Sequence, residues 1–212
     1  MLSCKVLIDI SKLPLADVSG IVHVGAHHAE ELNTYLRIGI DRVVWVEANA
    51  DNMPIIFQKI TNFPYMTAAN FAAGSKSDIK VNLNLANNGE SSSILELGTH
   101  ALHYPHIRYK DQKSVTQLRL DDYFVRSGLQ PSQFNFLNLD LQGYELECLR
   151  GASTVLKAIK YLYTEVNTES VYNECALINE VDAYLAQFGF ERVITKLLDQ
   201  GWGDAFYTKL DS

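Results

Sequence analysis

A glycine turn and a distant acid are the first pair of residues whose spacing suggests ligand binding. Gly25 closes a short apolar run and is followed by Ala26 and two histidines. Small residues in such a turn let a ligand approach the backbone at a helix N-terminus. Glu47 ends the next apolar run, 22 residues after Gly25, where an acid can hold ribose hydroxyls. The pair predicts a site for a nucleoside cofactor; the alternative is that Glu47 only caps the next helix.

The residues after the turn discriminate between two such cofactors. Ala29 stands where a dinucleotide-binding turn would place its third glycine, and Glu30 and Glu31 occupy the expected helix start. Two acids there would repel a diphosphate but attract the amino group of a bound methionine. The sequence therefore favours S-adenosylmethionine over NAD, and a nucleotide-linked oxidoreductase stays open as an alternative.

Asp140 is the best candidate for a catalytic group. It follows an apolar run and opens a turn into a helix, and ligands of open α/β sheets lie outside the carboxyl ends of the strands. We predict that Asp140 is a general base, which accepts a hydroxyl proton as a C–O bond forms; the alternative is a helix N-cap. Tyr144 follows closely enough to form the acceptor wall. His27, on the cofactor turn, is expected to donate to the donor carboxylate or to face the acceptor.

A metal-assisted version of the same site is a second interpretation. Glu165 and Asn167 end the next strand and could cluster with Asp140 as oxygen ligands of Mg²⁺. We favour the metal-free interpretation, in which both residues hydrogen-bond the acceptor or Asp140, because no dedicated carboxylate pair is visible.

Three histidines at 100, 103 and 106 form another possible metal set. Pro105 interrupts any helix there and no cysteine or acid joins them. We expect a loop near the acceptor rather than a metal site.

The elements that must position these residues alternate along the chain. Alternating strands and helices predict an α/β fold, with a mostly parallel seven-stranded sheet and helices on both faces. A closing antiparallel hairpin distinguishes the chain from nicotinamide-binding Rossmann domains, which continue with parallel units. The expected strands are 21–25, 43–48, 65–73, 135–141 and 161–167, the helices are 28–37, 51–61, 145–157 and 174–188, and the hairpin strands are 190–198 and 204–210.

One irregular segment interrupts this alternation within a single domain spanning 1–212. Residues 74–134 contain a polar stretch at 87–93 and an expected strand at 115–120. The length suits a lid or acceptor-binding segment. A surface extension of two or three strands without a ligand role is the alternative.

Composition excludes several classes of partner. The net charge is −7 and no basic stripe occurs, which argues against nucleic acid. No apolar run is long enough to insert into a membrane, and no signal-peptide pattern is present. The three cysteines, Cys4, Cys148 and Cys175, are odd in number and widely spaced. We therefore expect no disulfide framework and a reducing, cytoplasmic location.

Five segments together resemble the FkbM-type methyltransferase family over about residues 21–152: VHVGAHHAEE, VWVEAN, AAGSKSD with SSSIL after it, LRLDDYF, and NFLNLDLQGYELECLRGA. The resemblance implies a Rossmann-like class I methyltransferase fold, S-adenosylmethionine as donor, and O-methylation of sugars or polyketide-like alcohols. By position it assigns cofactor contacts to the turn, to the ribose acid, to the adenine edge and to the aspartate that ends the fourth strand: Gly25, Ala26, His27, Glu47, Phe71, Ala72 and Asp140. We expect Glu30, Ala48 and Asn49 to contact the cofactor as well. His23 belongs to the same set, but it stands where the family commonly has an acid, and Ala29 stands where it commonly has a glycine.

These observations lead to one expected function with alternatives. We expect a metal-independent O-methyltransferase that acts on a hydroxyl of a sugar or glycan, taken as a small molecule or an oligosaccharide. Because relatives include modules of larger glycan-assembly proteins, membership of such a protein is a further expectation. The alternatives are a cation-dependent O-methyltransferase of a sugar or polyketide-like alcohol and a non-catalytic module, although the presence of both Glu47 and Asp140 argues against the latter.

Overall fold

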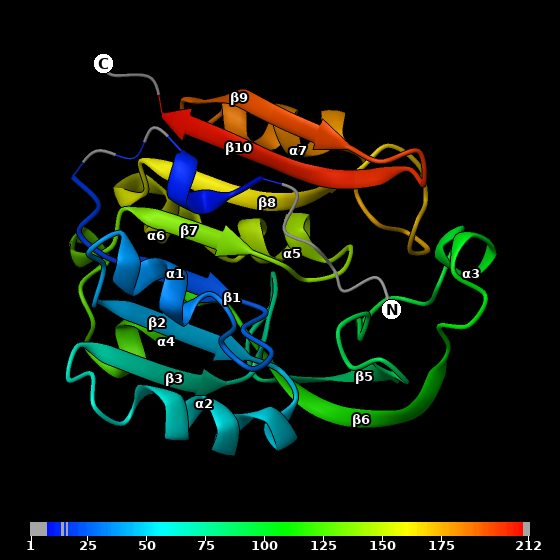
Figure 1. Cartoon of the computed structure of the whole chain (residues 1–212), viewed down its shortest axis with the longest axis horizontal. Coiled ribbons are helices and arrows are strands. Elements are labelled where there is room, and N and C mark those ends of the chain that lie inside the picture. The colour runs from blue at the N-terminus through cyan, green and yellow to red at the C-terminus, as the bar shows by residue number, and fades with distance from the viewer. Residues whose placement is uncertain (1–7, 14, 16, 210–212) are drawn as a thin grey trace.

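A computed structural model of the chain describes residues 8–13, 15 and 17–209 (Figure 1). Its main sheet has seven strands in the order β3-β2-β1-β7-β8-β10-β9. The first five are parallel to one another, and β10 runs antiparallel to both β8 and β9. This confirms the predicted sheet and its closing hairpin. The strands are β1 (Ile21–Val24), β2 (Val43–Glu47), β3 (Met66–Asn70), β7 (Phe136–Leu139), β8 (Tyr161–Asn167), β9 (Phe190–Leu197) and β10 (Trp202–Lys209).

The central strands are buried on both faces. Every residue of β1, β2, β7 and β8 is buried, as expected for apolar runs in a parallel sheet covered by helices. Val24 pairs with Val46 on one side and with Leu139 on the other. Three strand ends therefore lie level, and the residues that follow them emerge at one edge.

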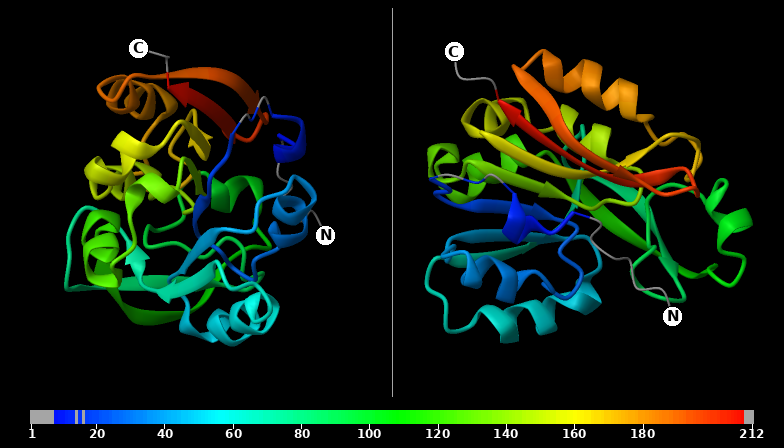
Figure 2. Two further views of the ribbon diagram at one scale, coloured as in Figure 1. Left: turned by 90° about the vertical axis from the view of Figure 1, so that its left-hand side faces the viewer. Right: turned by 45° about the horizontal axis from the view of Figure 1, so that its top comes forward.

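Helices cover the two faces of this sheet (Figure 2). Two apolar clusters fill the space between the layers, one beneath α1, α2 and the 3₁₀ turn η1, and the other beneath α4, α5, α6 and α7. The helices are α1 (Leu32–Arg37), α2 (Met53–Ile60), α3 (His100–His103), α4 (Leu120–Ser127), α5 (Glu145–Arg150), α6 (Ser153–Ala158) and α7 (Ile178–Ala186), with 3₁₀ turns η1 (Ile10–Lys12), η2 (Ala50–Asn52) and η3 (Pro131–Gln133).

Two predicted helices begin later than the sequence pattern indicated. The helix expected from 28 starts at Leu32, because His27 and Ala29 adopt positive φ values of 42° and 53°, which end any helix. The helix expected from 174 starts at Ile178. There the Glu180 carboxylate accepts a hydrogen bond from the Leu177 amide at 2.8 Å and so fixes the helix start.

Other expected elements are divided. The helix predicted over 145–157 breaks at Gly151 into α5 and α6. The strand predicted over 65–73 breaks at Phe71, after which β4 (Ala72–Ala73) joins a second sheet. The second hairpin strand begins earlier than predicted, at Trp202, and its expected end at Leu210 lies outside the described residues.

The 74–134 segment carries most of that second sheet. Its strands β5 (Ile79–Ala86) and β6 (Tyr109–Leu118) pair antiparallel, and β4 completes the order β4-β6-β5. The strand expected over 115–120 therefore starts earlier and ends at Leu118, because α4 begins at Leu120. Figure 1 shows β5, β6 and α3 beyond the carboxyl ends of β1, β2 and β7.

Two findings bear on the expected location. Across the described ranges, no helix is both long enough and apolar enough to cross a membrane. Cys148 and Cys175 are buried free thiols, and Cys4 lies outside the described residues. The reducing compartment stays a prediction.

Candidate active site

A pocket opens at the edge where β1, β2 and β7 end. Four parts of the chain that are distant in sequence meet there: the turn after β1, the end of β2, the strand break at Phe71 and the turn after β7. The 74–134 segment closes one side. The pocket is lined by Val24, Gly25, His27, Glu30, Glu31, Val46, Glu47, Ala48, Asn49, Asn52, Phe71, Ala72, Ala73, Leu83, Gly89, Glu90, Ser92, Ser93, Ile94, Asp140, Leu141 and Tyr144.

The turn after β1 has room only for glycine at position 25. Gly25 has a φ of +86°, and a Cβ atom there would lie 1.8 Å from the Asp140 carbonyl oxygen. The amides of Gly25 and Ala26 both donate to the Val46 carbonyl, at 2.9 and 3.0 Å. The turn is therefore held between β2 and β7, where the Asp140 backbone leaves no space for a side chain.

Glu47 is oriented by two backbone amides. Its Oε2 accepts from the His27 amide at 2.7 Å and its Oε1 from the Asn49 amide at 2.6 Å. The Asn52 side chain bonds the same carboxyl. A carboxylate offers about four lone-pair sites, so one acceptor site remains for a ribose hydroxyl. Burial raises the pKa of this carboxyl, which is 8% exposed. The helix-cap alternative is wrong, because Asn49 caps the following turn η2 through the Asp51 amide.

The predicted adenine edge also lies on the pocket. Phe71 and Ala72 line it beside Ala48 and Asn49. The Phe71 ring packs against Tyr123, with 5.2 Å between ring centroids. An aromatic ring and small side chains give a flat apolar slot that suits a purine.

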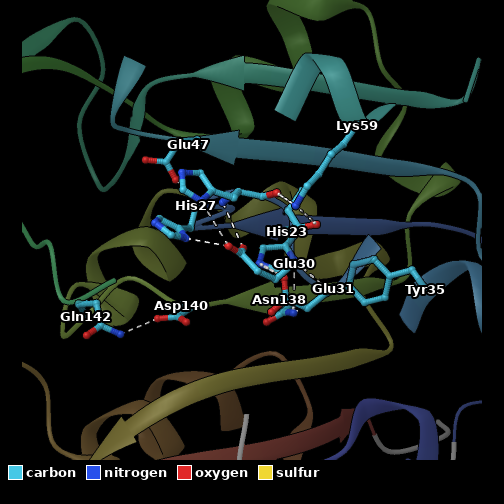
Figure 3. A network of polar contacts seen from close by, with 12 residues as sticks. His23, His27, Glu30, Glu31, Tyr35, Glu47, Lys59, Asn138, Asp140 and Gln142 are labelled. Carbon is cyan, nitrogen blue, oxygen red and sulfur yellow. Dashed lines mark hydrogen bonds and ion pairs between the residues drawn. The ribbon is translucent and has the colours of Figure 1, made fainter. Parts of the chain in front are cut away.

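A charged pair lies beside the glycine turn (Figure 3). His27 Nδ1 lies 2.9 Å from Glu30 Oε1, and Glu30 Oε2 accepts from the His28 amide at 3.1 Å. The bond to Glu30 raises the pKa of His27. Burial opposes ionisation of Glu30, yet its contacts with His27 lower the pKa of Glu30 to about 2. Glu31 is the second acid beside the turn, and burial raises its pKa.

Two predicted cofactor residues, His23 and Ala26, lie beneath the pocket and do not line it. They are 2% and 1% exposed. His23 Nδ1 is 2.9 Å from the Tyr35 hydroxyl and its ring packs on Trp45. Burial lowers the pKa of His23 to about 4, so its ring is neutral. These two residues support the turn from below.

Asp140 lines the pocket, and its side chain is exposed there. Its Oδ1 accepts from Gln142 Nε2 at 2.7 Å (Figure 3). Although the side chain is exposed to the pocket, desolvation by the protein atoms around its carboxyl, with the charges of Glu31 and Asp204, raises the pKa of Asp140 to about 7 despite that hydrogen bond. A carboxylate that titrates near neutral pH suits general base catalysis.

Asp140 does not cap the helix that follows it. The amides of Leu141 and Gly143 donate instead to Glu145 Oε1, at 2.9 and 3.2 Å. The α5 N-cap position is Tyr144, which makes no side-chain cap bond. Tyr144 lines the pocket, and its hydroxyl donates to Gln117 Oε1 at 3.1 Å.

Glu165 and Asn167 lie behind Asp140 and are not pocket-lining residues. Glu165 Oε2 accepts from Gln142 Nε2 at 3.0 Å, so the glutamine amide stands between the two carboxylates. Asn167 is buried, and its Oδ1 has no hydrogen-bond partner among the described residues. A cation shared by Asp140 and Glu165 would have to displace the Gln142 amide.

The three spaced histidines are remote from the pocket lining. His100 and His103 lie on the short helix α3, where a loop was expected. His100 is buried, and His103 Nε2 lies 2.9 Å from Glu169 Oε1. They do not group as metal ligands in the part of the chain that the structure describes.

Only His27, His28 and Glu30 come close enough, within the described ranges, to form a ligand group. The two imidazole rings stack, with centroids 3.9 Å apart and an interplanar angle of 28°. Ligand lone pairs lie in the ring planes, and nearly parallel planes do not converge on one ion. This group is not arranged for metal binding.

Sequence reasoning missed several pocket residues. Asn52 lies just beyond the predicted ribose segment, and Gln142 stands behind Asp140. The polar stretch at 87–93 did signal a role, but its side chains could not be placed without the second sheet. From the 74–134 segment, the structure adds Leu83, Gly89, Glu90, Ser92, Ser93 and Ile94 to the pocket.

Comparison with known proteins decides the family. The sequence model of the methyltransferase FkbM domain matches residues 23–192, most of the chain. The chain belongs to the FkbM methyltransferase family. The family and the fold support a methyltransferase that depends on S-adenosylmethionine. The 2-O-methyltransferase NoeI of Sinorhizobium fredii is 29% identical to this FkbM methyltransferase over 82 residues, which are 39% of this chain and 33% of NoeI. The match therefore spans about a third of that relative.

Solved structures share the fold of this FkbM methyltransferase at low identity. The N-methyltransferase NodS of Bradyrhizobium japonicum is 9% identical, with a TM-score of 0.51 over 92% of this chain and 87% of NodS. TrmK of M. capricolum, solved with S-adenosylhomocysteine, is 9% identical, with a TM-score of 0.50 over 94% of this chain and 65% of TrmK. A Rossmann-superfamily protein of Streptococcus agalactiae is 11% identical, with a TM-score of 0.52 over 94% of this chain and 66% of that protein. These structural similarities support the fold and nothing further.

Proposed function

We propose that this FkbM methyltransferase moves a methyl group from S-adenosylmethionine to a hydroxyl oxygen of a sugar or glycan, with Asp140 as general base and without a metal ion. One observation carries the proposal: Glu47 and Asp140 line a single pocket, at the ends of the two strands that flank β1. Glu47 is placed to bind the ribose of the donor, and Asp140 is placed to accept a proton at the reacting end.

The residues present fit the donor. Gly25 brings backbone without a side chain to the pocket, Glu47 keeps an acceptor site for a ribose hydroxyl, and Phe71 lines the pocket where adenine would lie. Glu30 and Glu31 suit a positively charged amino group. When bound, the donor supplies a methyl group on a cationic sulfur that leaves as a neutral thioether.

Asp140 takes the proton that the acceptor hydroxyl loses. An alcohol is far too weak an acid to ionise in advance against a carboxylate. Its oxygen becomes acidic as the C–O bond forms, and the proton then passes to Asp140, so the two changes are concerted. A pKa of about 7 makes Asp140 a stronger base than an exposed aspartate while leaving it largely ionised in mildly alkaline solution.

The acceptor class and the metal-free chemistry have separate support. Transfer to oxygen is consistent with NoeI, a 2-O-methyltransferase, and the sugar acceptor rests on the family resemblance. The metal-free mechanism is supported by the Gln142 amide, which occupies the space between Asp140 and Glu165.

The 74–134 segment is the proposed acceptor-binding part. Leu83, Glu90 and Ser92 bring apolar, acidic and hydroxyl groups to the pocket. Such a mixed wall suits the hydroxyls and ring faces of a small carbohydrate or an oligosaccharide. A place within a larger glycan-assembly protein is part of the same proposal.

The test is product analysis with a labelled donor. The protein is incubated with methyl-labelled S-adenosylmethionine and a panel of oligosaccharides, and products are fragmented in a mass spectrometer. We expect one labelled methyl group on a sugar oxygen, absent with the Asp140→Asn variant. Label on nitrogen or carbon, or label on polyketide-like alcohols but on no sugar, would refute the proposed acceptor.

A further inference from the structure

Gln142 is a buried side chain whose polar atoms are all engaged. It is 5% exposed. Its Nε2 donates to Asp140 Oδ1 at 2.7 Å and to Glu165 Oε2 at 3.0 Å, and its Oε1 accepts from the Tyr172 hydroxyl at 2.6 Å. An amide group has two hydrogens to donate, and here each meets a different carboxylate.

The backbone of Gln142 is also held from two sides. The Ser93 hydroxyl, from the 74–134 segment, donates to the Gln142 carbonyl at 2.7 Å. The next residue, Gly143, packs so closely that a Cβ there would lie 3.0 Å from the Cβ atoms of Tyr172 and Cys175. Gln142 itself has a φ of +52°. A left-handed glutamine is uncommon and persists where its surroundings fix it, often at functional sites.

We propose that Gln142 is a positioning residue for methyl transfer: its amide holds Asp140 by Oδ1, so that Oδ2 is left for the acceptor hydroxyl. Glu165 and Tyr172 in turn hold the amide. Among the described residues, no hydrogen bond reaches Oδ2 of Asp140. The inference rests on the proposed role of Asp140 as base.

The amide also solves an electrostatic problem at this site. The charged groups that face Asp140 are His27 and Glu31 beside the glycine turn, and Glu145, Glu165 and Asp204 on α5, β8 and β10. Four of these five are acids, and like charges disfavour ionisation of Asp140. Gln142 adds no charge, and its donated hydrogen bond stabilises the ionised form. It thereby lowers the pKa of Asp140 against the effect of burial and the acids.

Carbon NMR of the Asp140 carboxyl tests this role without an acceptor. The resonance is assigned by its loss in Asp140→Asn, and its titration is compared between the native protein and Gln142→Met, which has a similar length and no donor. A hydrogen bond to a charged group is worth about 1.5–3 kcal/mol, so we expect the Asp140 pKa to rise by about one unit or more. The control Gln187→Met, an exposed residue after α7, should leave the titration unchanged.

Tyr172→Phe provides a milder variant should Gln142→Met fail to fold. It removes only the hydroxyl that holds Gln142 Oε1, and the Asp140 pKa should rise by a smaller amount in the same direction. Once an acceptor is identified, both variants should lower kcat. The pH at which kcat reaches half of its maximum should rise, whereas KM for the donor should stay within about threefold of the native value.

Two failures are distinguishable. An Asp140 titration that is unchanged in the folded Gln142→Met or Tyr172→Phe protein overturns the positioning role, whatever Asp140 does in catalysis. An Asp140→Asn enzyme with native turnover removes the base from the proposed function, and with it any catalytic purpose of Gln142, even if the titration shifts as expected.

Discussion

The Gly25 backbone lies directly against the carbonyl of Asp140, so close that a Cβ atom on Gly25 would be 1.8 Å from that oxygen. The residue that opens the cofactor turn and the residue proposed as base are therefore in contact through their backbones. Neither can move without the other, because Gly25 is also hydrogen-bonded to Val46 and the Asp140 amide to Val24.

This contact predicts how much stability the protein loses when one methyl group is added at Gly25. Gly25→Ala should lower the free energy of unfolding by about 3 kcal/mol, from left-handed strain plus overpacking against Asp140. Gly39→Ala is the matched control, since Gly39 has a φ of +83° with nothing within 4 Å of a Cβ, and it should cost only about 1 kcal/mol. Urea unfolding measures both. If both variants lost the same free energy of unfolding, the close approach of Gly25 to Asp140 would not contribute to stability.

The central strands β1, β2, β7 and β8 were predictable because each is a buried, mostly apolar run that ends at, or just before, a polar or glycine residue. The starts of α1 and α7 were not, since they depend on the positive φ of His27 and on the cap at Leu177. The alternation in β5, IKVNLNLA, is a strand signal that the sequence offered but that the prediction did not use.

The site was predictable in part, for a similar reason. Gly25 and Asp140 directly follow strands and Glu47 ends one, so their places are fixed by sheet topology. The part played by Gln142 depends on Glu165 and Tyr172, which reach it only through tertiary packing. No local pattern at 140–145 contains that information.

The raised pKa of Asp140 predicts a stability that falls as pH rises. Well below about pH 4, aspartate is protonated in both states. Between that pH and about 7, the unfolded chain releases the proton while the folded protein retains it, so folding is disfavoured. Asp140→Asn should therefore raise Tm at pH 8 and much less at pH 4. The exposed control Asp111→Asn should show no such difference, and a gain for Asp140→Asn that does not grow with pH would contradict the raised pKa.

The same substitution predicts a loss of turnover. Asparagine keeps the size of Asp140 and can still accept the Gln142 hydrogen bond, but it is not a base. With an acceptor identified, kcat should fall on the order of 10²–10⁴-fold, and native kcat/KM should rise with pH and level off above about 7. Binding of S-adenosylhomocysteine should change little. If S-adenosylmethionine alone binds more weakly, Asp140 also attracts the sulfonium charge; turnover within a few-fold of native would rule Asp140 out as base.

Chelation tests the metal-free mechanism. Enzyme treated with EDTA should retain its activity, and added Mg²⁺ should change the rate by less than about twofold, because the Gln142 amide and not a cation bridges Asp140 and Glu165. An inactive chelated enzyme that Mg²⁺ or Mn²⁺ restores would instead make Glu165 and Asn167 the candidate ligands.

Titration calorimetry with S-adenosylhomocysteine and NAD tests the central claim, that this pocket binds the methyl donor, most directly. We predict one binding site for S-adenosylhomocysteine and no heat with NAD. Glu47→Ala should weaken binding by about 1.5–3 kcal/mol, or roughly 10- to 100-fold, because the ribose would lose a charged hydrogen-bond acceptor. The exposed control Glu191→Ala on β9 should bind as the native protein does. Unchanged affinity in a folded Glu47→Ala protein, or binding of NAD in place of S-adenosylhomocysteine, would contradict the account.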